Sequence, residues 1–254
     1  MQIDFKGMTA LVTGAGSGIG AATAVGLADA GAHVVVHYNR NEQGAAAVKR
    51  AIEEGGGSAD VAQADLTGSQ AASRLVEETL QSRGAIDILV NNAGDLVRRS
   101  NITDLTDEDF HRIMDLNLTS VFTMCRAVVP AMRERGAGSI INLTSIAARN
   151  GGGGGSAVYA TSKAAVSTFT RGLAKEVALD GIRVNAVSPG VIATPFHERH
   201  TSEEQMAVMV AGVPMRRMGT PEECVGAVLF LASDAMSGYV TGQILEVNGG
   251  QLMP

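Results

Sequence analysis

The sequence predicts an α/β fold in which a doubly wound, mostly parallel seven-stranded sheet of Rossmann type carries helices on both faces. Short β-branched runs alternate with Ala-rich helical stretches through most of the 254 residues. The strand-like runs are mostly continuous apolar stretches, as expected when helices cover both faces of a parallel sheet. No internal repeat or inter-domain linker interrupts this alternation, so residues 1–254 are expected to form one domain.

The elements follow one another in a regular order. Strands are expected at Thr9–Thr13, His33–His37, Val61–Ala64, Ile86–Asn91, Ser139–Leu143, Arg183–Ser188 and Gln243–Val247. Helices are expected at Ile19–Ala30, Glu42–Glu54, Ser69–Arg83, Asp107–Arg135, Val158–Leu179 and Pro221–Leu231. Right-handed crossovers between such strands produce a doubly wound sheet. Residues 191–218 carry no strand signal, and we interpret them as a substrate-covering insertion, with an ordinary surface excursion as the alternative.

Composition excludes several classes of function. The net charge of −6 disfavours binding along nucleic-acid phosphates, and no apolar run reaches the length of about 18 residues needed to span a membrane. Cys125 and Cys224 lack metal-ligand spacing, so two buried, reduced thiols and no metal site are expected. The beginning of the chain has no signal-peptide pattern, and a cytoplasmic protein is expected.

A glycine-rich turn connects the first expected strand to the first helix. Residues 13–20 read TGAGSGIG. Gly14 allows a sharp turn, Gly18 allows the backbone to approach a pyrophosphate, and Gly20 allows close packing of helix against strand. The N-terminus of the helix then presents free N–H groups to the phosphates. The spacing differs from the common dinucleotide fingerprint, because that pattern is broken at Ile19.

This TGxxxGIG turn resembles that of the short-chain dehydrogenase/reductase family. Five further stretches fit the family in order. They are the acidic residue Asp65, NNAG at 91–94, YxxxK at 159–163, PGVIAT at 189–194 and VNGG at 247–250. The resemblance therefore spans nearly the whole chain. It implies an NAD(P)-dependent oxidoreductase that assembles as a homotetramer.

The expected catalytic residues are Asn117, Ser145, Tyr159 and Lys163. Tyr159 and Lys163 lie four residues apart on one helix face, and a nearby ammonium is expected to lower the tyrosine pKa from about 10. Ser145 follows a strand and could donate a hydrogen bond to the substrate oxygen. The family resemblance implies that Asn117 holds a water beside the lysine, whereas the alternative is an asparagine exposed on its helix.

The resemblance also implies a dinucleotide site spread over the whole chain. Asp65 would lie at the adenine, Lys163 at a ribose, and the 189–194 segment at the nicotinamide. The expected cofactor-binding residues are Gly14, Ser17, Gly18, Ile19, Gly20, Tyr38, Asn39, Arg40, Asp65, Leu66, Asn91, Ala93, Gly94, Tyr159, Lys163, Pro189, Gly190, Ile192 and Thr194.

The second strand predicts NADP as the preferred cofactor, with NAD also possible. It is followed by His37-Tyr38-Asn39-Arg40-Asn41, and no carboxylate occurs before Glu42. An acidic residue would repel the 2′-phosphate, whereas Arg40 can pair with it. Ser17 is an opposing sign, because NADP-preferring relatives often carry a basic residue at that place.

Two functions are compatible with this sequence. One is an oxidoreductase acting on a small carbonyl or secondary-alcohol substrate, similar to 3-oxoacyl-carrier-protein reductases or to glucose and polyol dehydrogenases. The other is a non-catalytic protein that senses a dinucleotide. The catalytic set favours the enzyme, because a sensor has no need of an acid/base tyrosine. Arg98, Arg99 and Arg149 could form a basic entrance for an acyl carrier, and the glycines at 151–155 leave the shape of the substrate open.

Overall fold

The computed structural model describes residues 3–253, and within them seven strands form one parallel sheet. The strand order is β3-β2-β1-β4-β5-β6-β7, which confirms the predicted fold class. The strands are β1 (Thr9–Val12), β2 (His33–Tyr38), β3 (Ser58–Gln63), β4 (Ile88–Asn91), β5 (Gly138–Leu143), β6 (Ile182–Pro189) and β7 (Ile244–Val247).

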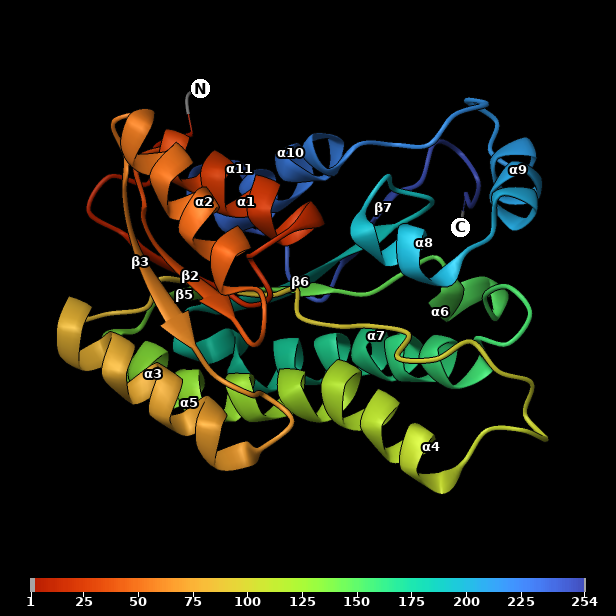
Figure 1. Ribbon diagram of the computed structural model, residues 1–254. Helices are drawn as coiled ribbons and strands as arrows, with labels where there is room; N and C mark the ends of the chain where they lie inside the picture. The colour runs from red at the N-terminus through yellow and green to blue at the C-terminus, as the bar shows by residue number, and fades with distance from the viewer. Residues whose placement is uncertain (1–2, 254) are drawn as a thin grey trace.

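Helices cover both faces of the sheet (Figure 1). One layer holds α1 (Gly18–Asp29), α2 (Glu42–Glu54), α10 (Pro221–Ala232) and α11 (Asp234–Ser237). The other holds α3 (Ser69–Arg83), α4 (Asp107–Met114), α5 (Ser120–Arg135) and α7 (Ala157–Val177). The remaining helices are α6 (Ala147–Asn150), α8 (Pro195–His200) and α9 (Glu203–Ala211), which lie together at one end. None of the described helices has the length and apolar character to span a bilayer.

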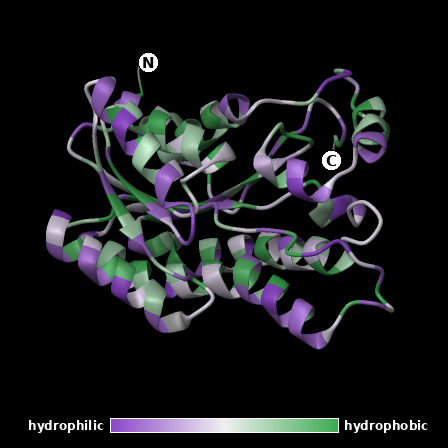
Figure 2. Cartoon of the chain, viewed as in Figure 1, coloured by the Kyte–Doolittle hydropathy of each residue, from purple (hydrophilic) through white to green (hydrophobic). Residues whose placement is uncertain are grey.

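Alternation along the strands produces two apolar cores, one on each face. In β1, Ala10 and Val12 belong to the core beneath α1 and α10, whereas Leu11 belongs to the core on the opposite face. This follows from the two-residue period of a strand. Figure 2 shows the matching pattern, with apolar residues along the sheet and on the inner sides of the helices.

The strand order reverses at β1, which pairs with β2 on one side and β4 on the other. The loops after β1 and β4 therefore leave the sheet side by side, and ligands bind at such a switch point in open α/β sheets. Here the backbone N–H groups of Asn92 and Ala93 both donate to the Thr13 hydroxyl at 3.0 Å. The glycine turn and the NNAG segment are thus fixed to each other.

The long helix expected over Asp107–Arg135 is interrupted by one π-helical turn at Asp115–Thr119. Asn117 lies in this turn, and its side-chain amide donates to the carbonyls of Ile113 at 2.9 Å and Asp95 at 2.7 Å. A π turn swings a side chain out of the usual helical register and is frequent at functional sites. The residue pattern gives no sign of it, because helix propensity is similar on both sides of the turn.

Two further elements differ from the prediction. The third strand begins at Ser58 rather than Val61, because β3 is the edge strand and its exposed ends carry polar residues. Residues 191–218 contain α8 and α9, and Ile192 at their start forms a single parallel bridge with Gly219, just beyond their end. The short helices α6 and α11 were not expected either.

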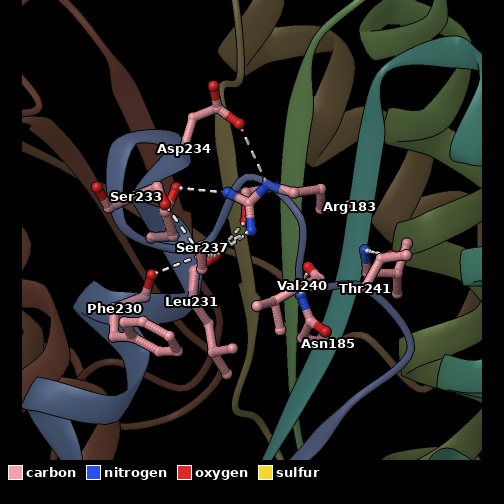
Figure 3. A network of polar contacts seen from close by, with 12 residues as sticks. Arg183, Asn185, Phe230, Leu231, Ser233, Asp234, Ser237, Val240 and Thr241 are labelled. Carbon is pink, nitrogen blue, oxygen red and sulfur yellow. Dashed lines mark hydrogen bonds and ion pairs between the residues drawn. The ribbon is translucent and has the colours of Figure 1, made fainter.

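Arg183 joins the sheet to the end of α10 (Figure 3). Its guanidinium donates to the carbonyls of Leu231 at 2.7 Å and Ala232 at 3.0 Å, and to the Ser237 hydroxyl at 3.0 Å. Asp234 lies 3.6 Å from its Nε. A helix ends with carbonyls that lack partners within it, and a cation satisfies them while opposing the helix dipole.

Replacing this arginine should destabilise the fold. Arg183→Met leaves the Ala232 carbonyl without its side-chain donor and removes one of three donors to the Leu231 carbonyl, so we expect a loss of about 1–3 kcal/mol of unfolding free energy in urea titrations. The control is Arg133→Ala, which removes an exposed ion pair to Asp180 and should cost less than about 1 kcal/mol. Equal losses in the two variants would contradict the capping role.

Candidate active site

A cavity of about 1340 Å³ lies at the carboxyl ends of the strands. Its walls come from the glycine turn, the loops after β2 to β6, α7 and the 191–218 segment. The wall includes most of the predicted site residues: Gly14, Ser17, Gly18, Ile19, Tyr38, Asn39, Arg40, Asp65, Leu66, Ala93, Gly94, Ser145, Tyr159, Lys163, Pro189, Gly190, Ile192 and Thr194. Ser145, the Tyr159–Lys163 pair and the 189–194 segment therefore line the same cavity as the N-terminal glycine turn.

The glycine turn has the form of a phosphate cradle. Gly14 and Gly18 adopt φ of +63° and +55°, which favours glycine. A Cβ on Gly14 would lie 2.9 Å from Ala93 Cα, and one on Gly18 would lie 3.2 Å from Thr194 Cγ2. The first turn of α1 has no acidic residue, and Ser17 makes no side-chain cap there. The free N–H groups at the start of α1 therefore suit the pyrophosphate of a dinucleotide.

His37 holds this turn from behind, although the sequence analysis did not single it out. The Gly14 N–H donates to His37 Nδ1 at 3.1 Å, and Nε2 lies 3.0 Å from the Ala64 carbonyl. Burial lowers the pKa of His37 below 6.5, which favours the neutral ring that accepts at Nδ1 and donates from Nε2. A histidine at the end of an otherwise apolar strand was the available signal.

The loops after β2 and β3 form the far end of the cavity. Thr67 donates to Asp65 through its N–H at 3.1 Å and its hydroxyl at 2.8 Å. These bonds hold the pKa of Asp65 below 3.8, and Asn39 and Arg40 lower it further. No carboxylate lies between Tyr38 and Asn41, and Asp65 is the acidic residue of the wall that faces Arg40.

Lys163 and Asn117 converge on one small polar space. The Lys163 side chain is buried and donates to the Leu143 carbonyl at 2.9 Å, and burial lowers its pKa to about 8. Asn117 is fully buried and its Oδ1 has no hydrogen-bond partner in the described residues. A Cβ on Gly94 would lie 2.6 Å from that oxygen and 3.0 Å from Lys163 Nζ. The alternative of an exposed Asn117 is therefore wrong.

Tyr159 has a different pKa from the one expected. Its surroundings raise the pKa to about 12, chiefly through burial, while hydrogen bonding to Ser145 lowers it and Asp95 raises it. Lys163 Nζ lies 5.9 Å from the centre of the Tyr159 ring and donates its hydrogen bond to the Leu143 carbonyl instead. The expected net lowering of the Tyr159 pKa is thus wrong for this structure, because burial dominates, and Tyr159 is a neutral phenol at pH 7, the form that donates a proton.

Three predicted residues lie behind the cavity wall rather than on it. Gly20 packs beneath the Asn92 side chain, which donates to the carbonyls of Thr13 and Gly14. Asn91 donates to Asn142 Oδ1 at 2.9 Å and lies in the sheet interior. Asn117 is the third, because it reaches the site only past Gly94. A supporting role therefore replaces direct cofactor contact for Gly20 and Asn91.

The wall near Tyr159 includes residues that sequence analysis did not single out. The Phe196 ring lies 5.6 Å from the Tyr159 ring and 5.3 Å from that of His200. His200 Nε2 lies 2.7 Å from an Asp95 carboxylate oxygen. These contacts bring α8 against the tyrosine. They depend on tertiary packing, so no local motif could have revealed them. The described residues contain no cluster of His, Cys, Asp and Glu that could hold a metal, and both cysteines are free and buried.

Comparison with known proteins agrees with this geometry. A family model described as enoyl-(acyl carrier protein) reductase matches residues 14–251. The 3-oxoacyl-[acyl-carrier-protein] reductase of a Synechocystis species is 42% identical, over 96% of both chains. An NADH-dependent reductase, A1-R′, crystallised with NAD, is 39% identical over the whole of both chains, with a TM-score of 0.89. A Beutenbergia cavernae protein provisionally named an NAD(P)-dependent gluconate 5-dehydrogenase, with NADP at low occupancy, is 39% identical over 99% of both chains, with a TM-score of 0.92.

The burial of Lys163 predicts a specific pH dependence of stability. The folded protein releases this proton near pH 8, whereas the unfolded chain keeps it to about pH 10.4. The unfolded state then binds more protons across that interval, so stability rises with pH. Relative to the non-titrating Lys163→Met, the wild-type apoprotein should gain about 3 kcal/mol of unfolding free energy from pH 8 to 10.5.

Urea unfolding of both proteins at the two pH values measures this gain. Lys175→Met is the control, because Lys175 is exposed on the same helix and its removal should leave the pH dependence unchanged. Parallel curves for wild type and Lys163→Met would show that Lys163 stays charged when folded.

Proposed function

Because the chain belongs to the short-chain dehydrogenase/reductase family, we propose that it transfers a hydride between NADP(H) and a carbonyl or secondary alcohol, with Tyr159 as general acid and base. One observation carries this proposal. A single cavity joins an uncapped helix N-terminus, which suits phosphates, to Ser145, Tyr159 and Lys163. A dinucleotide whose phosphates lie at the helix N-terminus would extend to these three side chains.

Different parts of the cavity wall would bind different parts of the dinucleotide. The turn from Gly14 to Gly20 would hold the pyrophosphate, and Asp65 with Leu66 would border the adenine. Pro189, Gly190, Ile192 and Thr194 would orient the nicotinamide, which supplies or accepts the hydride when bound.

The chain itself manages the proton. In reduction, Tyr159 donates its phenolic proton to the carbonyl oxygen, and Ser145 stabilises the developing charge with a hydrogen bond. Lys163 holds a ribose hydroxyl and favours the phenolate that remains. The unpartnered Asn117 Oδ1 faces the same space as Lys163 Nζ, which suits a water that returns the proton from solvent.

Nothing in the geometry favours the dinucleotide sensor. A buried ammonium and a buried unpartnered amide oxygen are both unfavourable in a folded protein. Binding of a ribose accounts for the ammonium alone, whereas proton transfer accounts for both groups and for their place beside Tyr159. The residues 191–218 are proposed to cover the substrate, since α8 lies against Tyr159. A homotetramer remains a prediction from the family resemblance, and a cytoplasmic location remains a prediction from the sequence.

Removing the proton donor tests the proposed chemistry. Tyr159→Phe keeps the ring contact with Phe196 but lacks the hydroxyl, so turnover of the best substrate in a carbonyl and alcohol panel should fall at least about 100-fold. Binding of the reduced dinucleotide, followed by its fluorescence, should change little. Tyr239→Phe is the control, because Tyr239 is fully exposed. Turnover near wild type in Tyr159→Phe would sink the assignment.

The loop after β2 supports NADP(H) as the preferred cofactor. Arg40 is exposed on the cavity wall, and the segment from Tyr38 to Asn41 offers no carboxylate to repel a phosphate. Asp65 is the nearby competitor for Arg40. Its carboxylate is already engaged by Thr67, which leaves the guanidinium able to pair with a 2′-phosphate.

Cofactor choice is measured as the ratio of kcat/KM with NADPH to kcat/KM with NADH. Wild type should favour NADPH, and Arg40→Ala should lose roughly tenfold or more of that ratio, as expected for a charged hydrogen bond. Arg50→Ala, an exposed arginine on α2 away from the cavity, should keep the wild-type ratio. A wild-type preference for NADH, or an unchanged ratio in Arg40→Ala, would refute the role of Arg40.

A further inference from the structure

Arg99 is a partly buried arginine of the cavity wall that is not paired with a carboxylate in the described residues. Its Nε donates to the His200 carbonyl at 2.8 Å, and its Nη1 donates to the Gly154 carbonyl at 2.6 Å. Two neutral carbonyls hold the side chain in place but leave its charge uncompensated and part of its donor fork free. Partial burial lowers the pKa of Arg99, but the guanidinium stays charged at pH 7 and is open to an anion in the cavity.

The backbone before Arg99 is strained. Val97 adopts φ of +64°, which a β-branched residue rarely does, and the Arg98 N–H donates to the Leu96 carbonyl at 2.7 Å. This is a γ-turn centred on Val97. It separates two consecutive arginines, because Arg98 pairs with Asp109 at 3.1 Å on the surface while Arg99 enters the cavity wall. Strain of about 1–3 kcal/mol is typically retained where it serves a site.

The glycine-rich loop at 151–155 is shaped around the same side chain. Gly155 has φ of +74°, and a Cβ there would lie 2.8 Å from Arg99 Cγ. The Ser100 N–H donates to the Gly155 carbonyl at 3.0 Å. The loop can therefore pack against the arginine stem and offer it the Gly154 carbonyl. This gives the unusual glycine run a role in fixing Arg99.

No charged side chain of α8 supplies Arg99 with a counter-charge in the described residues. Asp95 is the acidic residue of this part of the wall, and it is engaged by His200 at 2.7 Å and by Arg199 at 3.5 Å. His197 lines the cavity as well, and burial together with Arg99 and His200 lowers its pKa, which favours a neutral ring. A single negative charge therefore matches Arg99 better than a dianion does.

We propose that Arg99 binds a carboxylate of the substrate, so that the enzyme acts on small hydroxy acids and the matching keto acids. This proposal rests on the hydride transfer proposed above. In oxidation, the carbinol carbon gives its hydride to the nicotinamide and the hydroxyl gives its proton to the phenolate form of Tyr159, which thereby becomes the neutral phenol, while the carboxylate is unchanged. Arg99 and Tyr159 line the same cavity and are linked through Phe196 and the His200 carbonyl, so we expect one small molecule to carry both the acid group and the reacting carbon.

Matched acids and amides test this recognition. The probes are glycerate, threonate and gluconate, each compared with its primary amide at saturating dinucleotide. The variants are Arg99→Gln, which removes the charge, Arg99→Lys, which keeps it, and Arg98→Gln as the surface control. For at least one pair, wild type should favour the acid in kcat/KM by roughly 10- to 100-fold. Arg99→Gln should lose that preference, Arg99→Lys should retain part of it, and Arg98→Gln should stay within about twofold of wild type.

Three outcomes of the comparison between acids and amides would overturn the proposal. They are a wild-type enzyme that favours no acid over its amide, a preference that survives in Arg99→Gln, and an equal loss in Arg98→Gln. A higher kcat/KM for glycerol 3-phosphate than for glycerate that is lost in Arg99→Gln would show that Arg99 binds a phosphate. That result would also overturn the proposal.

A binding measurement separates this proposal from the proposed chemistry. In the Tyr159→Phe background with NADP⁺ bound, titration calorimetry with gluconate and gluconamide reads acid recognition without turnover. Tighter binding of gluconate that disappears on adding Arg99→Gln supports the carboxylate site even if Tyr159 proves dispensable. Equal binding of the two compounds, with and without Arg99, contradicts it even if Tyr159→Phe abolishes turnover.

Discussion

The buried ammonium of Lys163 is the constraint around which this site is organised. A cation removed from water needs dipoles or counter-charges, and this one has the Leu143 carbonyl at 2.9 Å as its hydrogen-bond acceptor in the described residues. Its remaining donors face the space beside Gly94, where the Asn117 oxygen also lacks a partner. Both groups are satisfied only when a polar atom occupies that space. The apoprotein is therefore built to receive hydroxyls or water at this point, at a cost to its own stability.

Several features of the fold follow from that requirement. Gly94 cannot carry a side chain, because a Cβ would meet both polar groups. The π turn at Asp115–Thr119 brings Asn117 inward, and bonds to the Ile113 and Asp95 carbonyls fix its orientation. Asp95 in turn holds His200 on α8 through its carboxylate. Asp95 therefore orients the Asn117 amide beside Lys163 and also anchors α8, which contacts Tyr159. This one residue links the lysine side of the site to the tyrosine side.

Much of this arrangement was predictable from local patterns. The parallel, doubly wound sheet follows from alternation of apolar strands and helices, and the glycine turn, Ser145, Tyr159 and Lys163 are recognisable from the sequence. The π turn was not, because the helical pattern continues across it. The predicted direction of the Tyr159 pKa shift is wrong, because burial raises this pKa and the Lys163 ammonium is hydrogen-bonded to the Leu143 carbonyl. The sequence places Arg99 with Arg98 and Arg149 in a possible basic entrance but does not distinguish it from them, because its orientation depends on a strained turn and on loops distant in sequence.

The most direct test of the central claim follows the hydride itself. Wild type and Tyr159→Phe would each be mixed, in single turnover, with NADPH carrying deuterium at the hydride position and with ethyl acetoacetate as a neutral ketone. The product is then analysed by mass spectrometry. We expect one deuterium on the carbinol carbon with wild type, formed far faster than with Tyr159→Phe. Deuterium transfer at the same rate in both proteins, or none in wild type despite bound dinucleotide, would contradict the assignment of Tyr159 and of the enzyme.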